Sequence, residues 1–225
     1  MRVLVTGGAS GLGAAVVQRV RDDGGRPLVI DRRPVGGDVE HIQADLADRE
    51  AAERAVHSLA RSADGLDAVV TAAGIDACGP LGEVPAADWD RVIKVNLLGT
   101  AAVVRAALPY LTAAPNGRVV TCASTLGLRA LSDATAYCAA KFGVVGFSRA
   151  LAAETAGRIG VTMLVPGGMD TAFFDGRDEQ YKPPQDAKLN RPEDVAAAVM
   201  FALRQPPGCE VRELLICPSE EPSWP

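Results

Sequence analysis

The sequence predicts a three-layer α/β fold, in which a doubly wound parallel sheet of about seven strands carries helices on both faces. Short runs of β-branched residues alternate along the chain with longer runs rich in alanine. Runs such as Ala68–Val70 and Arg118–Val120 lack a polar residue at every second position. Strands that are buried on both faces of a parallel sheet have this pattern.

The alternation predicts each element in turn. The expected strands are Arg2–Thr6, Pro27–Asp31, His41–Ala44, Asp67–Thr71, Gly117–Ala123, Gly160–Val165 and Arg212–Cys217. The expected helices are Leu12–Arg21, Arg49–Ser62, Ala87 to about Leu111, Ala136–Thr155 and Pro192–Arg204. Asp48 is expected to cap the second helix, because an aspartate side chain can accept the unpaired N–H groups of a first turn.

We expect one domain over residues 1–225, because no linker, repeat or charge run divides the 225 residues. The longest stretch without a predicted element, about 168–190, is expected to be a lid loop, since long loops in compact domains are usually functional. Residues 218–225 form a short acidic tail that contains Trp224.

Composition narrows the possible partners. The chain is 48% hydrophobic and has a net charge of −5, so neither nucleic acid nor an anionic membrane is an expected partner. The five cysteines include no CxxC pair, which favours reduced thiols, and no metal site is expected. No secretory signal is visible and no run of 18 uncharged apolar residues appears, so no transmembrane helix is expected. These features predict a cytoplasmic protein.

A glycine-rich turn, Thr6–Gly13, directly follows the first strand and opens the first helix. Glycines let the backbone approach a pyrophosphate closely, and the helix N-terminus supplies free N–H groups. Asp31 ends the second strand, where a carboxylate can accept hydrogen bonds from an adenosine ribose. This order is that of a Rossmann dinucleotide-binding unit; the alternative interpretation is a glycine turn without a ligand.

Tyr137 and Lys141 lie four residues apart on a predicted helix and therefore on one face. A phenol is a poor acid or base at neutral pH, but a nearby ammonium favours the phenolate and lowers its pKa. Tyr137 could then exchange a proton with a substrate oxygen. The alternative is a core tyrosine above a surface lysine.

Two polar residues complete the candidate site. Ser124 follows the fifth strand, at the carboxyl edge of the sheet where ligands bind, and the alternative is a solvent-facing turn serine, which is common. Asn96 lies within an otherwise apolar helix and needs hydrogen-bond partners. It either interrupts the helix and holds a water molecule or satisfies a local backbone kink.

Together these motifs resemble the short-chain dehydrogenase/reductase family from Val3 to about Cys217. The resemblance implies that Asn96, Ser124, Tyr137 and Lys141 form the catalytic tetrad, with Lys141 also binding the nicotinamide ribose and Asn96 holding a relay water. Motif and resemblance together give the expected cofactor-binding residues as Gly7, Ser10, Gly11, Leu12, Gly13, Asp31, Arg32, Asp45, Leu46, Ala73, Gly74, Tyr137, Lys141, Pro166, Gly167 and Thr171.

The chain departs from the family pattern at two places. Thr71-Ala72-Ala73-Gly74 stands where the family usually has Asn-Asn-Ala-Gly, so one bracing amide is lost. The C-terminal strand leads into the acidic tail rather than into a glycine-rich ending.

The expected activity is hydride transfer between a nicotinamide and a carbonyl or secondary-alcohol carbon. NAD is the expected cofactor, because the Asp31 carboxylate would repel a 2′-phosphate and Ser10 places no cation beside the turn. Arg32 and Arg33 keep NADP open as the less favoured alternative. A second hypothesis is a catalytically silent nucleotide-sensing or regulatory module. A sugar epimerase or dehydratase is disfavoured, since the chain leaves no room for the extra domain.

An apolar ketone or alcohol is the expected small-molecule substrate. The expected pocket wall is mostly apolar and consists of Leu126, Leu128, Leu131, Cys78, Phe173, Phe174 and Tyr181. A homodimer or homotetramer is expected, because the segments 97–108 and 136–153 are apolar nearly all round and lack a natural solvent face.

Overall fold

The computed structural model describes residues 1–224 and contains, within them, one seven-stranded sheet that is parallel throughout. The strand order is β3-β2-β1-β4-β5-β6-β7. The strands are β1 (Arg2–Thr6), β2 (Arg26–Asp31), β3 (Glu40–Gln43), β4 (Ala68–Thr71), β5 (Arg118–Cys122), β6 (Gly160–Pro166) and β7 (Glu213–Ile216). The predicted three-layer Rossmann architecture is therefore confirmed.

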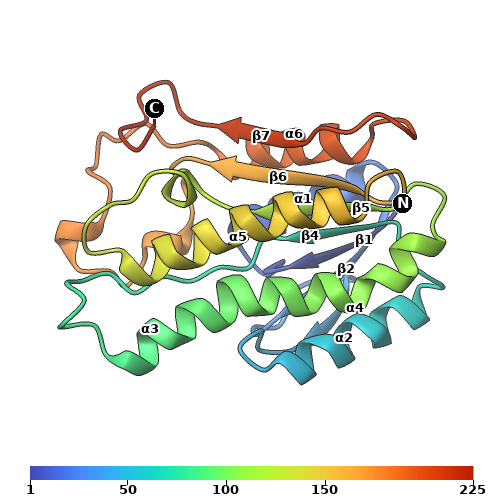
Figure 1. Ribbon diagram of the computed structural model, residues 1–225, viewed down its shortest axis with the longest axis horizontal. Coiled ribbons are helices and arrows are strands. Elements are labelled where there is room, and N and C mark those ends of the chain that lie inside the picture. The colour runs from blue at the N-terminus through green and yellow to red at the C-terminus, as the bar shows by residue number, and fades with distance from the viewer. Residues whose placement is uncertain (225) are drawn as a thin grey trace.

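Helices cover both faces of the sheet (Figure 1). They are α1 (Gly11–Asp22), α2 (Arg49–Ser62), α3 (Ala86–Ile93), α4 (Thr100–Ala113), α5 (Thr135–Glu154) and α6 (Pro192–Leu203). Helices α1 and α6 pack together on one face, whereas α2, α4 and α5 cover the other. Asp48 caps α2 as predicted, because its carboxylate accepts the N–H of Ala51 at 3.0 Å.

Burial on both faces of the sheet explains why polar and apolar residues do not alternate along the strands. Val3, Leu4 and Val5 of β1 are all fully buried, because the central strand meets helices on both faces. Leu4 belongs to the core beneath α2 and α4, whereas Val3 and Val5 belong to the core beneath α1 and α6. The strand therefore contributes to both cores with successive side chains.

The chain reverses its direction of winding between β1 and β4, since β2 and β3 lie on one side of β1 and the later strands on the other. Ligands in open parallel sheets bind outside the carboxyl ends of the strands at such a point. In Figure 1 the arrowheads point to the same edge, where the orange segment before α6 also lies. The fold thus gathers the loops after β1, β4, β5 and β6 at one edge.

The largest departure from the predicted elements is in the long third helix. The structure divides it into α3, a π-helical turn η1 (Lys94–Gly99) and α4. The predicted long loop also contains short helical turns, η3 (Ala172–Phe174) and η4 (Glu179–Tyr181). The ends of that loop are paired with each other, because Met169 and Asn190 form a parallel bridge.

The continuous helical stretch 86–113 is long and apolar enough to cross a membrane, and within residues 1–224 it alone meets that test. It carries charged residues such as Arg105, so a search for uninterrupted apolar residues passes over it. Inside the fold, 56% of its most apolar window is buried. This burial is typical of a core helix that packs against a sheet.

Candidate active site

A cavity of about 940 Å³ lies at the carboxyl edge of the sheet. One end is lined by the glycine turn and by Asp31, Arg32 and Arg33. The other end is lined by Ser124 and Tyr137. The residues found at these ends suit an adenosine at the first end and a nicotinamide at the second.

Gly7 and Gly13 make the turn after β1 possible, in two different ways. Gly7 has a φ of +73°, and a Cβ there would meet the Cα of Ala73 at 2.8 Å. A Cβ at Gly13 would come within 2.1 Å of the Gly7 carbonyl oxygen. Gly13 does not line the cavity, so it acts by letting helix α1 approach the turn. Because these glycines carry no side chain, the backbone of the turn can approach a ligand in the cavity closely, and backbone N–H groups suit a pyrophosphate.

Asp31 is buried at the end of β2 and braces the turn. Its two oxygens accept the N–H groups of Ala9 at 3.0 Å and of Arg33 at 2.8 Å. The guanidinium of Arg33 donates a hydrogen bond to the Ser10 hydroxyl. The prediction that no cation lies beside Ser10 is therefore wrong, because the side chain of Arg33 folds back across the mouth of the turn.

Asp45 and Leu46 line the cavity near its adenosine end. The Asp45 carboxylate pairs with Arg91 at 2.7 Å and accepts the N–H of Ala47 at 2.9 Å. Burial raises the pKa of Asp45, but these two hydrogen bonds and the positive charges of Arg91 and Arg32 together outweigh burial, and the net shift of the pKa is downward. Sequence reasoning missed Arg91, which comes from α3 and also lines the cavity.

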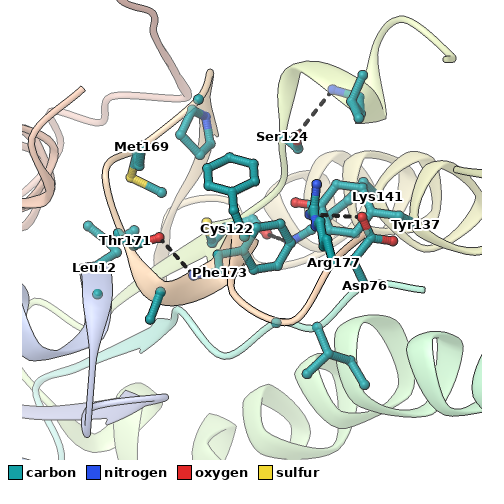
Figure 2. A pocket seen from close by; sticks show the side chains of 18 of the residues that line it. Leu12, Asp76, Cys122, Ser124, Tyr137, Lys141, Met169, Thr171, Phe173 and Arg177 are labelled. Carbon is teal, nitrogen blue, oxygen red and sulfur yellow. Dashed lines mark hydrogen bonds and ion pairs between the residues drawn. The ribbon is translucent and has the colours of Figure 1, made fainter. Parts of the chain in front are cut away.

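The other end of the cavity brings together Ser124, Tyr137 and Lys141 (Figure 2). Ser124 is buried after β5, and its hydroxyl accepts the N–H of Leu126 at 3.1 Å. Lys141 is also buried; its Nζ donates to the carbonyl of Cys122 at 2.7 Å and lies 5.5 Å from the Tyr137 ring centroid. The spacing on α5 therefore places the phenol and the ammonium on one face, as predicted.

The ionisation of this pair differs from the sequence expectation. Burial raises the pKa of Tyr137 well above its usual value, while hydrogen bonding with Ser124 acts in the opposite direction. Burial also lowers the pKa of Lys141. The prediction that Lys141 lowers the pKa of Tyr137 is not met in this structure, because desolvation of the phenol outweighs any favourable charge nearby.

Asn96 does not line the cavity but holds Ile75, a residue that does. Asn96 lies within η1, is 1% exposed, and forms two hydrogen bonds with one residue. Its Oδ1 accepts the N–H of Ile75 at 2.9 Å, and its Nδ2 donates to the Ile75 carbonyl at 2.8 Å. The side chain thus fixes the loop after β4, and the distortion of the helix accompanies this contact.

Residues 168–190, the predicted lid, lie beside the site, and their aromatic side chains line the cavity. The ring centroids of Phe173 and Tyr137 lie 5.6 Å apart. Arg177 of the same segment forms an ion pair with Asp76 at 3.0 Å, and the Tyr181 hydroxyl donates to Asp133 at 3.3 Å. All six residues line the cavity, so this segment is tied to two other loops at the substrate end of the cavity.

The acidic tail closes another part of the wall. The Glu221 carboxylate accepts the N–H of Gly168 at 2.8 Å. The Ser223 hydroxyl hydrogen-bonds that of Thr125 at 2.7 Å and also donates to Glu221. The tail therefore joins the ends of β5 and β6 beside the cavity.

Most of the predicted residues line this one cavity. Those that line it are Gly7, Ser10, Gly11, Leu12, Asp31, Arg32, Asp45, Leu46, Ala73, Gly74, Ser124, Tyr137, Lys141, Pro166, Gly167 and Thr171. Leu128 does not line it and packs instead against Val144 and Met163 in the core. The predicted apolar wall also missed charged residues, among them Asp76, Asp133 and Arg177.

Cys78 lines the cavity next to Asp76, and its thiol donates to that carboxylate at 3.3 Å. Burial and the neighbouring negative charge raise the pKa of the Cys78 thiol to about 11. The thiol is therefore neutral near pH 7 and supplies no nucleophile.

The chain is similar over most of its length to known dehydrogenases. Residues 1–182 match the family model described as short chain dehydrogenase. A D-threitol dehydrogenase of Mycolicibacterium smegmatis is 32% identical over 88% of this chain and 84% of its own. An uncharacterized oxidoreductase of Staphylococcus aureus is 29% identical over 96% of each chain. The crystal structure of a short-chain dehydrogenase from Burkholderia cenocepacia in complex with NADP shares 30% identity, covers 96% of each chain and has a TM-score of 0.83.

The fold, the glycine turn and the Ser124–Tyr137–Lys141 cluster thus define a dinucleotide-dependent oxidoreductase. The chain belongs to the short-chain dehydrogenase/reductase family. It is an NAD(P)-dependent enzyme that acts on CH–OH groups or the corresponding carbonyls.

Proposed function

We propose that this enzyme interconverts a ketone and a secondary alcohol, with Tyr137 as the acid or base and Ser124 as the second group that binds the reacting oxygen. The observation that carries the proposal is that Ser124, Tyr137 and Lys141 line the same cavity as the glycine turn. The nicotinamide cofactor supplies or accepts the hydride. The residues orient the substrate and move its proton.

The proposed proton path begins at the Tyr137 hydroxyl. In ketone reduction the phenol donates its proton to the substrate oxygen, while the Ser124 hydroxyl donates a hydrogen bond to the same oxygen. Lys141 is assigned the ribose of the nicotinamide and the stabilisation of the phenolate. Asn96 is assigned a positioning role, because it holds the Ile75 backbone beside the cavity.

The test is a spectrophotometric assay of NADH and NADPH oxidation with a panel of ketones, and of NAD and NADP reduction with the matching alcohols. We expect turnover with at least one pair. The alternative of a silent nucleotide-sensing module predicts that cofactor binds, as measured by its fluorescence, while no compound is turned over.

We propose NAD(H) as the preferred cofactor. The Asp31 carboxylate is buried where a ribose would lie, and it would repel a 2′-phosphate. Arg33 acts against this preference, because its exposed guanidinium reaches Ser10. We expect Arg33→Ala to lower kcat/KM with NADPH by about 10-fold while changing that with NADH less than about 3-fold. A wild-type preference for NADPH would contradict the NAD(H) proposal.

We propose that the enzyme assembles as a homodimer or homotetramer through helices α4 and α5. Leu98 is 52% exposed and Phe142 is 45% exposed, so both present apolar surface on this side of the fold. Light scattering at micromolar concentration should give the mass of a dimer or tetramer, and Phe142→Lys should shift it toward the monomer. A monomeric wild-type mass would exclude the assembly.

We propose that residues 168–190 act as a lid that orders when cofactor and substrate bind. The segment combines inward aromatic residues with an exposed Gly176 that has a φ of +78°. Hydrogen exchange across it should slow when cofactor and a substrate analogue are added together. Unchanged exchange would leave a static loop.

The cytoplasm is the proposed location. The support is the set of cysteines without a disulfide among the described residues and the burial of the long apolar helical stretch inside the fold. Fractionation of expressing cells, with detection of the chain in the soluble fraction, tests this location.

A further inference from the structure

The substrate end of the cavity contains a charged pair that neither the catalytic cluster nor the cofactor uses. Asp76 follows β4, and Arg177 belongs to the lid segment. Their Oδ2 and Nη2 atoms lie 3.0 Å apart, and the side chains are only 6% and 15% exposed. Such a pair costs desolvation energy and leaves little net charge.

Arg177 is held in a fixed orientation. Its guanidinium carbon lies 4.7 Å from the ring centroids of both Phe173 and Phe174. One terminal nitrogen donates to Asp76, and the other donates to the Tyr181 carbonyl at 3.3 Å. Each of these nitrogens carries two hydrogens, so a second N–H remains on each. The guanidinium is therefore a rigid donor at the cavity wall.

The pair also lies close to the reacting centre. The Arg177 guanidinium lies 4.7 Å from the ring centroid of Phe173, and that ring lies 5.6 Å from the ring of Tyr137. Figure 2 shows Asp76 and Arg177 beside Tyr137 and Lys141. A group bound at the pair would thus belong to the substrate close to its reacting oxygen.

We propose that the Asp76–Arg177 pair binds a hydroxyl group of the substrate, on a carbon adjacent or nearly adjacent to the reacting carbon. The substrate class is then hydroxyketones and the corresponding vicinal diols. This inference rests on the proposed function, and it adds a polar contact beside the apolar side chains of Leu126, Leu131 and Phe173, which also line the cavity.

The chemistry of the pair selects a hydroxyl over charged groups. A hydroxyl both donates and accepts, so it can donate to the carboxylate and accept from the guanidinium at once. A substrate carboxylate would meet the repulsion of Asp76, and a substrate ammonium would meet that of Arg177. A plain ketone leaves both groups without a ligand, although they stay paired with each other.

The same pair could instead serve only to tie the lid to the loop after β4, and the two roles predict different kinetics. A simple tie acts on every substrate alike, because it has no contact with the hydroxyl. Hydroxyl recognition acts on the ratio between two substrates that differ in that group alone. This ratio is independent of any common loss of activity.

The experiment compares kcat/KM for 3-hydroxy-2-butanone and 2-butanone, with the reduced cofactor the enzyme prefers. For the wild type we expect a ratio of about 10–100 in favour of the hydroxyketone, the range typical of one hydrogen bond to charged groups. In Asp76→Asn we expect the ratio to fall at least about 10-fold toward one. Glu53→Gln breaks an ion pair with Arg105 outside the cavity and should keep the wild-type ratio.

A wild-type ratio near one overturns the hydroxyl subsite while leaving the proposed function intact. A ratio that survives in Asp76→Asn, with both ketones slowed equally, also overturns it and assigns the pair to the lid alone. Absence of turnover with every ketone contradicts the proposed function. In that case ligand-observed NMR with the same two ketones and the same variant measures the preference as binding, and equal binding of the two overturns the subsite.

Discussion

Replacement of Tyr137 by phenylalanine is expected to lower kcat for ketone reduction by about 10²–10⁴-fold, the range for loss of one positioned acid. The ring of Tyr137 packs 5.6 Å from that of Phe173, and a phenylalanine ring preserves this contact. The substitution therefore removes the hydroxyl and little else. Steady-state kinetics with the preferred substrate pair measures the effect.

Tyr110→Phe is the matched control, because it removes a phenol hydroxyl that bonds His57 between α2 and α4, outside the cavity. It should retain wild-type kcat. If Tyr137→Phe also retained most of its activity, with unchanged cofactor binding, the assignment of Tyr137 as the acid would be wrong.

The same residue predicts a pH dependence that separates the two directions. Because burial raises the pKa of Tyr137, the phenol is protonated across the neutral range. Ketone reduction needs the phenol, so its rate should not change with pH in the neutral range. Alcohol oxidation needs the phenolate, so its rate should rise about 10-fold per pH unit. Tyr137→Phe should lose that rise. A level oxidation profile in the wild type would exclude the phenolate as the base.

The fold was predictable because its signals are local. Most strands of the sheet are short apolar runs, and the capping role of Asp48 depends on a residue three positions away. An interruption of the third helix at Asn96 was one of two interpretations of the sequence, and local signals could not decide between them; the structure shows the division. This division accompanies the hydrogen bonds between Asn96 and Ile75, which lie 21 residues apart, and an apolar periodicity contains no trace of that contact.

The candidate site was predictable where the family motif fixes it and not beyond. Ser124, Tyr137 and Lys141 meet because α5 and the end of β5 impose their positions. Asp76 and Arg177 lie 101 residues apart, and each looks like an ordinary surface charge in its own segment. Only the folding of the lid over the cavity brings them together, which is why an apolar wall was expected.

The electrostatics of the site were predicted less well than its geometry. The proximity of Lys141 to Tyr137 was correct, but proximity alone does not set a pKa. The sequence could not show that both groups are buried, and burial penalises each charged form separately. Similarly, the position of Arg33 after Asp31 did not reveal that its side chain folds back to Ser10.

Among substitutions that add a single methyl group in the cofactor site, Gly13→Ala is expected to reduce stability and cofactor affinity the most. Its Cβ would lie 2.1 Å from the carbonyl oxygen and 2.6 Å from the carbonyl carbon of Gly7. Both are backbone atoms of the phosphate turn, so helix α1 must move away. We expect the free energy of unfolding to fall by about 3 kcal/mol, at the upper end for overpacking, and cofactor affinity to fall at least about 10-fold.

Gly82→Ala is the matched control, because the added Cβ meets no atom of the described chain within 4 Å and the backbone has no positive φ. Its stability should stay within about 0.5 kcal/mol of wild type. Urea unfolding measures the stability, and quenching of protein fluorescence by NADH measures the affinity. Unchanged affinity in Gly13→Ala would mean that the turn tolerates displacement of α1, and the cofactor would then depend on Asp31 and Lys141 more than on the pyrophosphate contact.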